Sequence, residues 1–265
     1  MINIDKKLFL QHPTNIIAIT SGVGSMGKTW LATTLAHALN ILHQSVLLFD
    51  ADSGLLNADF QLATGAGRYL DDVISGDITM NQAIVAVNKK KFDVIAAAAG
   101  SEVLKSVPDG RLQILSEELS ILARCYKYTI MDLSSSEKII RNLLPMQVNL
   151  ILVCTQEPSN LVSTYQFLQN MGELAQYGNL QIVVNYANSQ EDGMRTYNTL
   201  RQACEQYIKK TPQLLGVIRR DTRVRDAIRN HSLFLSRYQH SEAAEDVMAI
   251  AHKLAEKGEQ NATEL

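Results

Sequence analysis

A short glycine-rich segment carries the clearest chemical signal in this chain. Residues 22–29 read GVGSMGKT and match the pattern G-x-x-x-x-G-K-T. Glycines in such a segment let backbone N–H groups turn toward phosphate oxygens, and the following helix adds the positive end of its dipole. We expect the Lys28 ammonium to contact the β and γ phosphates and the Thr29 hydroxyl to bind Mg²⁺. The segment therefore predicts a site for nucleotide phosphates and a metal ion.

The flanks of this segment support the prediction. An apolar run over residues 15–20 comes before it and a helical pattern over residues 28–42 follows it, so the glycines lie between a strand and a helix. The alternative for Trp30, the single tryptophan, is packing against the sheet, which is the commoner role of such a residue. The residues of this segment that we expect to bind the nucleotide are Gly22, Gly24, Ser25, Met26, Gly27, Lys28, Thr29 and Trp30.

Acidic residues follow two other apolar runs. Residues 46–52 read VLLFDAD and place Asp50 and Asp52 at the end of a strand. That end lies at the carboxyl edge of the sheet, where ligands bind in this architecture. One acid can hold a metal-bound water, and the other can orient a water near the γ phosphate. An acidic turn that only caps a helix is the alternative.

The second acidic strand end is weaker as a signal. Residues 128–132 read YTIMD, so Asp132 ends a mostly apolar run. An acid at this point usually lies behind the Mg²⁺ shell. Many strands end in aspartate, and the pattern gains its meaning from its place after the other two segments.

The rest of the chain alternates short apolar runs with helical patterns. Near-continuous apolar runs are typical of strands buried on both faces of a parallel sheet, and helices between them imply right-handed βαβ units. We therefore predict an α/β fold, a doubly wound, mostly parallel twisted sheet flanked by helices. The predicted strands are residues 15–20, 46–50, 92–97, 128–132, 149–155, 180–185 and 214–218, and the predicted helices are residues 28–42, 112–124, 159–174, 191–208 and 241–256, with shorter helical pieces at 70–74 and 80–87.

Length and composition fit a single domain. The chain has 265 residues, 46% of them hydrophobic, and a net charge of −2, which gives no whole-protein field for nucleic acid. The three cysteines are an odd number without metal spacing and favour a reducing cytoplasm. No apolar run is long enough for a transmembrane helix. We expect an N-terminal extension over residues 1–13, one domain over residues 14–256 and a polar tail over residues 257–265.

Three further segments make the chain similar to a known family. Residues 50–59 read DADSGLLNAD, residues 155–159 read TQEPS, and residues 215–225 read LGVIRRDTRVR. In this order and spacing, they and the glycine-rich loop resemble the deviant-Walker-A ATPases of the MinD/ParA group. The similarity is greatest to the FlhG/FleN branch, the MinD-like regulators of flagellar number, and it covers about residues 13–256.

The resemblance implies ATP or ADP with Mg²⁺ as cofactors and gives single residues a role. By analogy Asp52 is the hydrolytic acid, and Lys28 is the catalytic phosphate contact. The residues implied at the metal are Thr29, Asp52 and Asp132. The residues implied near the base are Asn185, which ends the run VVN, together with Arg219 and Asp221.

The departures from the family pattern are specific. The family loop reads K-G-G-V-G-K-T, but Val23 stands at the signature lysine, which in the family reaches the partner's phosphates in an ATP-sandwich dimer. Ser25 replaces a glycine, residues 132–136 read DLSSS in place of D-x-x-A-G, and Arg219 replaces a proline. An isopropyl group cannot stabilise phosphate charge, so we expect weak hydrolysis and an impaired ATP-dependent dimer.

Two peripheral parts of the family also differ. The activator motif D-Q-A-x-x-L-R is not present in residues 1–13, and the helix over residues 241–256 carries acids on its polar face rather than the basic face of a membrane-surface helix. We predict that this helix packs on the core. Localisation is then cytoplasmic, or peripheral or polar through a protein partner.

Three functions are consistent with these observations. The first is a MinD/FlhG-like ATPase that controls the placement or number of a polar structure such as the flagellum, with a flagellar or polarity regulator as its partner. The second is a degenerate, non-switching adaptor for a localisation or transcription partner. The third is a ParA-like DNA-partitioning ATPase, which the arginines of residues 219–229 suggest and the acidic net charge disfavours.

Overall fold

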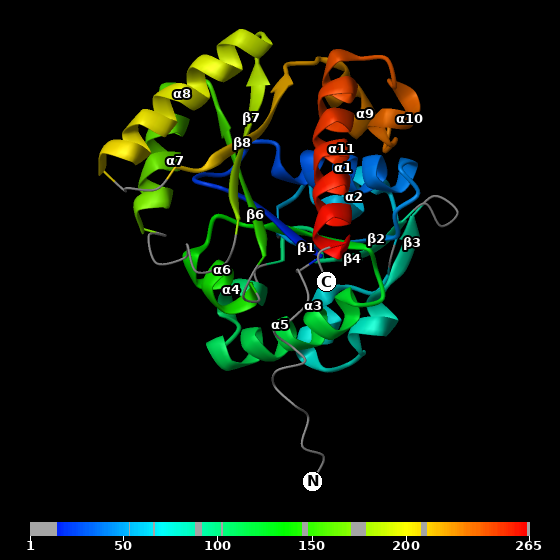
Figure 1. Ribbon diagram of the computed structural model, residues 1–265. Coiled ribbons are helices and arrows are strands. Elements are labelled where there is room, and N and C mark those ends of the chain that lie inside the picture. The colour runs from blue at the N-terminus through cyan, green and yellow to red at the C-terminus, as the bar shows by residue number, and fades with distance from the viewer. Residues whose placement is uncertain are drawn as a thin grey trace.

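A mixed sheet forms the centre of the molecule (Figure 1). The computed structural model describes residues 15–263 apart from residues 53, 66, 88–91, 102, 145–147, 171–178 and 208–210, with side chains as far as residue 256. Its strand order is β3-β4-β2-β5-β1-β6-β7-β8, and all neighbours are parallel except the pair β3 and β4. The strands are β1 Ile16–Ser21, β2 Val46–Ala51, β3 Val85–Val87, β4 Phe92–Ala96, β5 Tyr128–Leu133, β6 Asn149–Thr155, β7 Leu180–Ala187 and β8 Gln213–Arg219.

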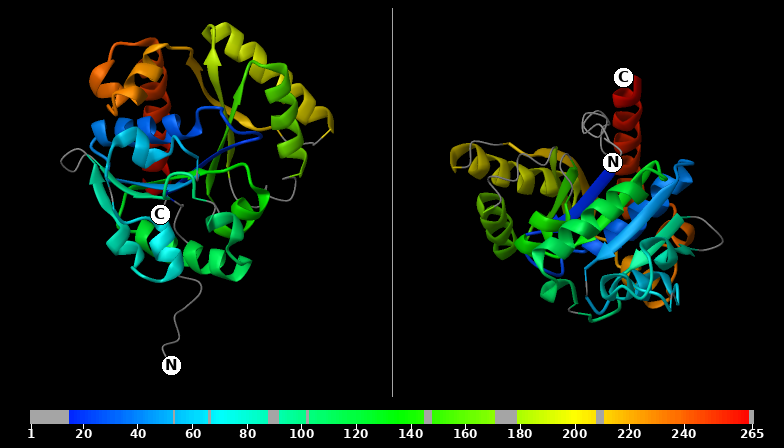
Figure 2. Two further views of the ribbon diagram at one scale, coloured as in Figure 1. Left: turned by 180° about the vertical axis from the view of Figure 1, so that it is seen from behind. Right: turned by 90° about the horizontal axis from the view of Figure 1, so that it is seen from below.

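Helices cover both faces of this sheet (Figures 1 and 2). Successive residues of β1 point to opposite sides: Ile17 and Ile19 join the core beneath α1, α10 and α11, and Ile16 and Ala18 join the core beneath α5 to α8. The helices are α1 Lys28–Ile41, α2 Ala58–Leu62, α3 Leu70–Ser75, α4 Val103–Ser106, α5 Asp109–Ala123, α6 Glu137–Leu143, α7 Pro158–Asn170, α8 Gln190–Tyr207, α9 Arg223–Arg229, α10 Phe234–Arg237 and α11 Glu242–Thr263, with a 3₁₀ turn, η2, over Met80–Ala83.

The predicted α/β class and all seven predicted strands are confirmed, with strand ends within two residues. The helical piece predicted for residues 80–87 is wrong in its second half. The 3₁₀ turn ends at Ala83, and β3 follows and pairs antiparallel with β4 at the sheet edge. A three-residue strand is too short to show a period, so the sequence pattern could not separate it from the helical turn beside it.

The C-terminal helix α11 packs on the core, as predicted. Val247, Ile250, Ala251 and Leu254 are at most 5% exposed and join the cluster beneath α1. The helix continues to residue 263, beyond residue 256, where we placed the end of the domain. Among the described helices, none has the length and apolar character needed to cross a membrane.

Candidate functional site

The glycine-rich segment makes a tight loop between β1 and α1. Ser25 and Gly27 adopt left-handed backbone, with φ of 65° and 82°. Gly22 lies against the backbone of α7, because a Cβ atom at this position would be 2.5 Å from the carbonyl oxygen of Ser163. A side chain at Gly22 would therefore push the loop away from α7, and the start of α1 would move with it.

The lysine of the phosphate-binding loop over residues 22–29, called the P-loop below, forms an ion pair with an acid that follows the next strand, β2. The Lys28 ammonium lies 3.1 Å from Oδ2 of Asp52, and the two side chains are 5% and 23% exposed. Asp50 has another role, since its carboxylate accepts the backbone N–H groups of Asp52 at 3.0 Å and Ala58 at 2.7 Å. Asp50 thus braces the turn after β2 and holds Asp52 over the P-loop.

Asp132 lies opposite Asp50 in the register of β5 and β2 and is fully buried. Burial raises the pKa of the Asp132 carboxyl to about 7, although Lys28 and the Thr29 hydroxyl oppose this rise. Thr29 is near enough to affect this pKa, yet no hydrogen bond of ordinary geometry reaches either oxygen of Asp132. Both carboxylate oxygens of Asp132 are therefore buried without a hydrogen bond, close to the hydroxyl of Thr29.

These unpartnered oxygens fit a Mg²⁺ site of the kind that the sequence predicts. A hydroxyl and a nearby carboxylate suit Mg²⁺, which keeps several of its waters and takes further ligands from phosphates. The described residues contain no group of three or more His, Cys, Asp or Glu side chains that could hold a metal by itself. Thr29 and Asp132 could therefore contribute to a metal site only together with a nucleotide and water.

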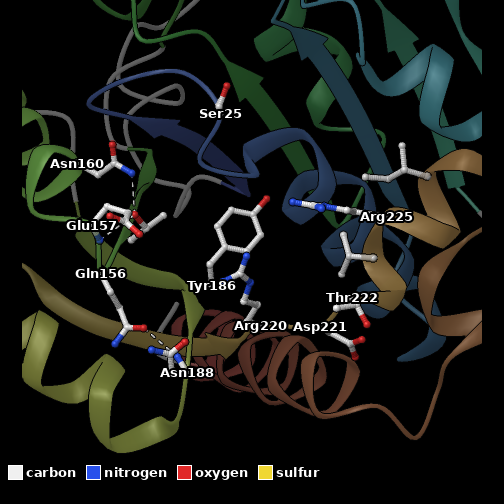
Figure 3. Close-up of a pocket in the computed structure, with 13 residues that line it drawn as sticks. Ser25, Gln156, Glu157, Asn160, Tyr186, Asn188, Arg220, Asp221, Thr222 and Arg225 are labelled. Atoms are coloured by element: carbon white, nitrogen blue, oxygen red, sulfur yellow. Dashed lines mark hydrogen bonds between the residues drawn. The ribbon is translucent and has the colours of Figure 1, made fainter.

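A cavity of about 620 Å³ opens beside the loop (Figure 3). Ser25 lines it from the P-loop side, and residues after β6, β7 and β8 form the rest of its wall. Its position at the carboxyl ends of parallel strands is where doubly wound folds bind ligands. The charged and amide side chains that line it are Gln156, Glu157, Asn160, Asn188, Arg220, Asp221 and Arg225.

Of the three residues predicted to lie near the nucleotide base, only one lines the cavity. Asp221 lines the cavity, where its carboxylate holds the guanidinium of Arg223 at 2.8 Å. Arg219 points to α11 instead and makes two hydrogen bonds of 2.9 Å to the carboxylate of Asp246. Asn185 is 1% exposed and does not line the cavity; its amide donates to the carbonyl of Met26 at 2.8 Å.

Trp30 packs in the core. Its side chain is 4% exposed, and its ring meets Phe234 edge to face at a centroid distance of 5.3 Å. The geometry of Trp30 therefore supports packing in the core, the alternative to nucleotide binding.

Two of the segments that depart from the family pattern, the glycine-rich loop and residues 132–136, lie at the same edge of the sheet. Val23 is 39% exposed at the loop, and its carbonyl accepts the hydroxyl of Ser21 at 2.5 Å. After β5, the backbone of Ser134 accepts the hydroxyl of Thr20 at 3.1 Å, and Ser136 caps α6. The serine run thus closes the end of β5 onto β1 and starts the next helix.

The sequence profile of the CobQ/CobB/MinD/ParA nucleotide binding domain matches residues 17–234, which include the loop, the acids and most of the cavity wall. The chain belongs to this family. The family is described as a nucleotide binding domain, and a loop of the form G-x-x-x-x-G-K-T holds nucleotide phosphates.

Relatives place the chain near the FlhG branch of this family. It is 25% identical to the antiactivator FleN of Pseudomonas aeruginosa over 94% of this chain and 89% of FleN. It is 23% identical to the flagellum site-determining protein YlxH of Helicobacter pylori over 95% and 85% of the two chains. In fold it resembles the septum site-determining protein MinD of Pyrococcus horikoshii, solved with Mg-ADP, with a TM-score of 0.75, 21% identity and coverage of 93% and 98%.

Most of the cavity lining was not among the predicted site residues, and Tyr186 is the aromatic member of this missed group. It follows Asn185 directly and lines the cavity with a ring that is 39% exposed. An aromatic residue immediately after a strand-end asparagine was the available signal. The pattern could not reveal which of the two side chains turns inward, because a bulge between β7 and β8 sets that direction.

Proposed function

We propose that the chain is a MinD/FlhG-like ATP-binding protein with slow Mg²⁺-dependent ATPase activity. The observation that carries this proposal is the cluster of Lys28, Asp52 and Asp132 at the P-loop, in which Lys28 and Asp132 are buried and Asp52 is partly exposed, together with the open cavity that Ser25 of the loop lines. Burying a lysine and an aspartate costs desolvation free energy that their ion pair only offsets. Packing alone therefore does not explain why these charges lie at this edge of the sheet.

The residues suggest how the site would act on ATP. Incoming phosphates compete with Asp52 for the Lys28 ammonium, and the lysine then neutralises the β and γ phosphates. Asp52, released from Lys28, can orient the attacking water and accept its proton. Mg²⁺, when bound, would neutralise further phosphate charge. Thr29 and Asp132 are the residues that would hold this ion and its waters.

Val23 accounts for the slow hydrolysis that we propose. The loop offers an isopropyl group at the position of the family's signature lysine, so a second copy would bring no charge to the phosphates from this position. Nucleotide binding needs only Lys28 and the loop of the same chain. We therefore propose binding as the retained property and the ATP-sandwich dimer as the weakened one.

For the cellular process, we propose control of flagellar number or placement. YlxH, whose match covers 95% of this chain, is named a flagellum site-determining protein, and this name supports the proposal. The test is deletion of the gene and a count of flagella per cell with their positions. We expect altered number or placement, and no restoration by Lys28→Ala. Normal flagella in the deletion strain would contradict the process but not the nucleotide site.

A non-switching adaptor is the second candidate, and the uncharged Val23 is the observation that favours it. In that case Lys28→Ala would restore the deletion strain as well as the unchanged gene does. DNA partitioning has less support, because Asp221 holds Arg223 and Asp226 holds Arg237 at 3.1 Å. A DNA affinity that falls steeply with salt would favour it nonetheless.

A further inference from the structure

Tyr186 has a backbone conformation that is rare for an aromatic residue. It lies near the end of β7 with φ of 57°, in the left-handed region that large side chains seldom adopt. The register of β7 against β8 is irregular between Val184 and Ala187, so the strand bulges at this point. The bulge turns the Tyr186 side chain out of the sheet and into the cavity.

Asn185 maintains this arrangement. Its side-chain oxygen accepts the backbone N–H of Tyr186 at 2.9 Å, and its side-chain nitrogen donates to the carbonyl of Met26 at 2.8 Å. With 1% of its surface exposed, Asn185 has almost no area left for a ligand. Its amide thus joins the P-loop to the bulge of β7.

The ring of Tyr186 lies beside the P-loop, in the cavity into which a nucleoside would extend from bound phosphates. In Figure 3 it rises through the middle of the cavity, with Glu157 and Asn160 on one side and Arg225 on the other. Its hydroxyl reaches the loop itself, since a Cβ atom on Gly27 would be 2.9 Å from this oxygen. A partly exposed ring in this place offers a flat face to any group that continues from the phosphates into the cavity.

The charges around the ring suit an extended, partly anionic ligand. Burial raises the pKa of the Tyr186 hydroxyl, and the positive charges of Arg225 and Arg220 oppose this rise. Both guanidinium groups therefore lie within electrostatic range of the ring. The ring thus has cations and the phosphate-binding loop near it, and Glu157 lies on its other side.

We infer that Tyr186 is the aromatic contact of the nucleoside in this chain and that Asn185 is a positioning residue for the P-loop. The family resemblance implied instead that Asn185 contacts the base. This inference rests on the proposed ATP site and deepens it. Stacking on an aromatic ring tolerates any base, so Tyr186 would favour a nucleoside triphosphate over a bare chain of phosphates.

The experiment compares two probes, ATP and inorganic tripolyphosphate, both with Mg²⁺, by equilibrium titration of the full chain. Tyr186→Asn removes the ring, and asparagine tolerates left-handed backbone. Tyr186→Phe keeps the ring. Asn185→Ala removes the amide that holds the loop. Tyr207→Asn, at an exposed tyrosine at the end of α8, is the matched control.

We expect Tyr186→Asn to weaken ATP binding by about tenfold or more and to leave tripolyphosphate binding within about twofold. Tyr186→Phe and Tyr207→Asn should bind both probes as the unchanged chain does. Asn185→Ala should weaken both probes alike, because it acts through the loop. The two Tyr186 variants suffice for the test if Asn185→Ala fails to fold.

Three results with the variants would overturn the inference. In one, Tyr186→Asn binds ATP as tightly as the unchanged chain; in another, it loses affinity for both probes equally. In the third, Asn185→Ala weakens ATP alone, which would return the base to Asn185. If the unchanged chain binds tripolyphosphate and ATP with equal affinity, the ring contributes nothing and only this inference fails. If it binds neither probe, the proposed ATP site fails as well.

Discussion

The ion pair of Lys28 and Asp52 competes with nucleotide binding in the free protein. Their 3.1 Å contact is largely buried, so bound phosphates must displace Asp52 from the lysine. Replacing Asp52 by asparagine keeps the shape and removes the competing charge. We expect Asp52→Asn to bind Mg-ATP about fivefold more tightly, which is a gain of about 1 kcal/mol, and to hydrolyse it more slowly.

The measurement is an equilibrium titration combined with a phosphate-release assay. Asp192→Asn is a suitable control, because Asp192 pairs with Arg195 on the exposed side of α8 at 2.7 Å. That change should alter neither quantity. Weaker ATP binding by Asp52→Asn would show that Asp52 supports the nucleotide rather than competing with it.

The sequence was enough to predict the charged residues of the candidate site. It was not enough to predict the side chains with which they pair. The spacing of the loop identified Lys28 and Thr29, and the strand ends identified Asp52 and Asp132. The pairing of Arg219 with α11 was hidden, because it depends on a helix that begins more than twenty residues later. Only the assembled fold brings these groups together.

The packing of the loop against α7 makes one glycine far more sensitive than its neighbour. A Cβ on Gly22 would lie 2.5 Å from the Ser163 carbonyl oxygen, whereas a Cβ on Gly24 would meet nothing within 4 Å. We therefore expect Gly22→Ala to reduce the free energy of unfolding by about 1–3 kcal/mol. Gly24→Ala should change it by less than about 0.5 kcal/mol.

Chemical denaturation of the two variants measures both effects under the same conditions. Equal losses of stability would mean that the contact between the loop and α7 is not what restricts Gly22. A loss in Gly24→Ala alone would contradict the packing described for this loop.

The meeting of β2 and β5 gives the nucleotide-free protein an unusual pH dependence. The pKa of Asp132 is about 7 in the folded chain and 3.8 for an ordinary aspartate. Between these values the folded state holds a proton that the unfolded state has lost. This carboxyl therefore stabilises the fold less as pH rises from about 4 to 7, and above 7 its contribution stays low.

Thermal unfolding from pH 5 to pH 8 tests this expectation when the unchanged chain is compared with Asp132→Asn. The unchanged chain should lose stability relative to the variant by on the order of 1 kcal/mol or more as pH rises. The effect of distant carboxylates cancels because both proteins share them, whereas Asp50, whose pKa is raised by burial and by the charge of Asp132, responds to the substitution and adds to the difference. A constant difference across this range would show that Asp132 is already ionised in the folded protein.

The strands could be predicted because each is buried on both faces and reads as an apolar run. The edge strand β3 could not, since three residues in an antiparallel pair leave no period. The bulge in β7 was equally hidden. It arises from the pairing with β8 and from the side chain of Asn185, neither of which local sequence reveals.

The whole molecule has the family fold, and Val23 stands at the loop position where the resemblance implies a lysine that contacts a second copy. We therefore expect the unchanged chain to keep the same size in solution with and without a non-hydrolysable ATP analogue. Val23→Lys restores the positive charge at the loop and should shift the protein toward a dimer when the analogue is present. Light scattering after size-exclusion chromatography measures both states.

A dimer of the unchanged chain that forms only with the analogue would contradict the role given to Val23. So would a Val23→Lys protein that binds the analogue and yet stays unchanged in size. Val162→Lys, the same change at an exposed valine of α7, is the matched control and should behave as the unchanged chain does.

The central claim is that Lys28 and its loop bind a nucleotide, and titration with Mg-ATP tests it most directly. Lys138→Ala, at a half-exposed lysine of α6, is the control and should bind as the unchanged chain does. We predict saturable binding by the unchanged chain and a loss of about 100-fold in Lys28→Ala, which corresponds to about 3 kcal/mol. No binding by the unchanged chain, or equal binding by Lys28→Ala, would contradict the account.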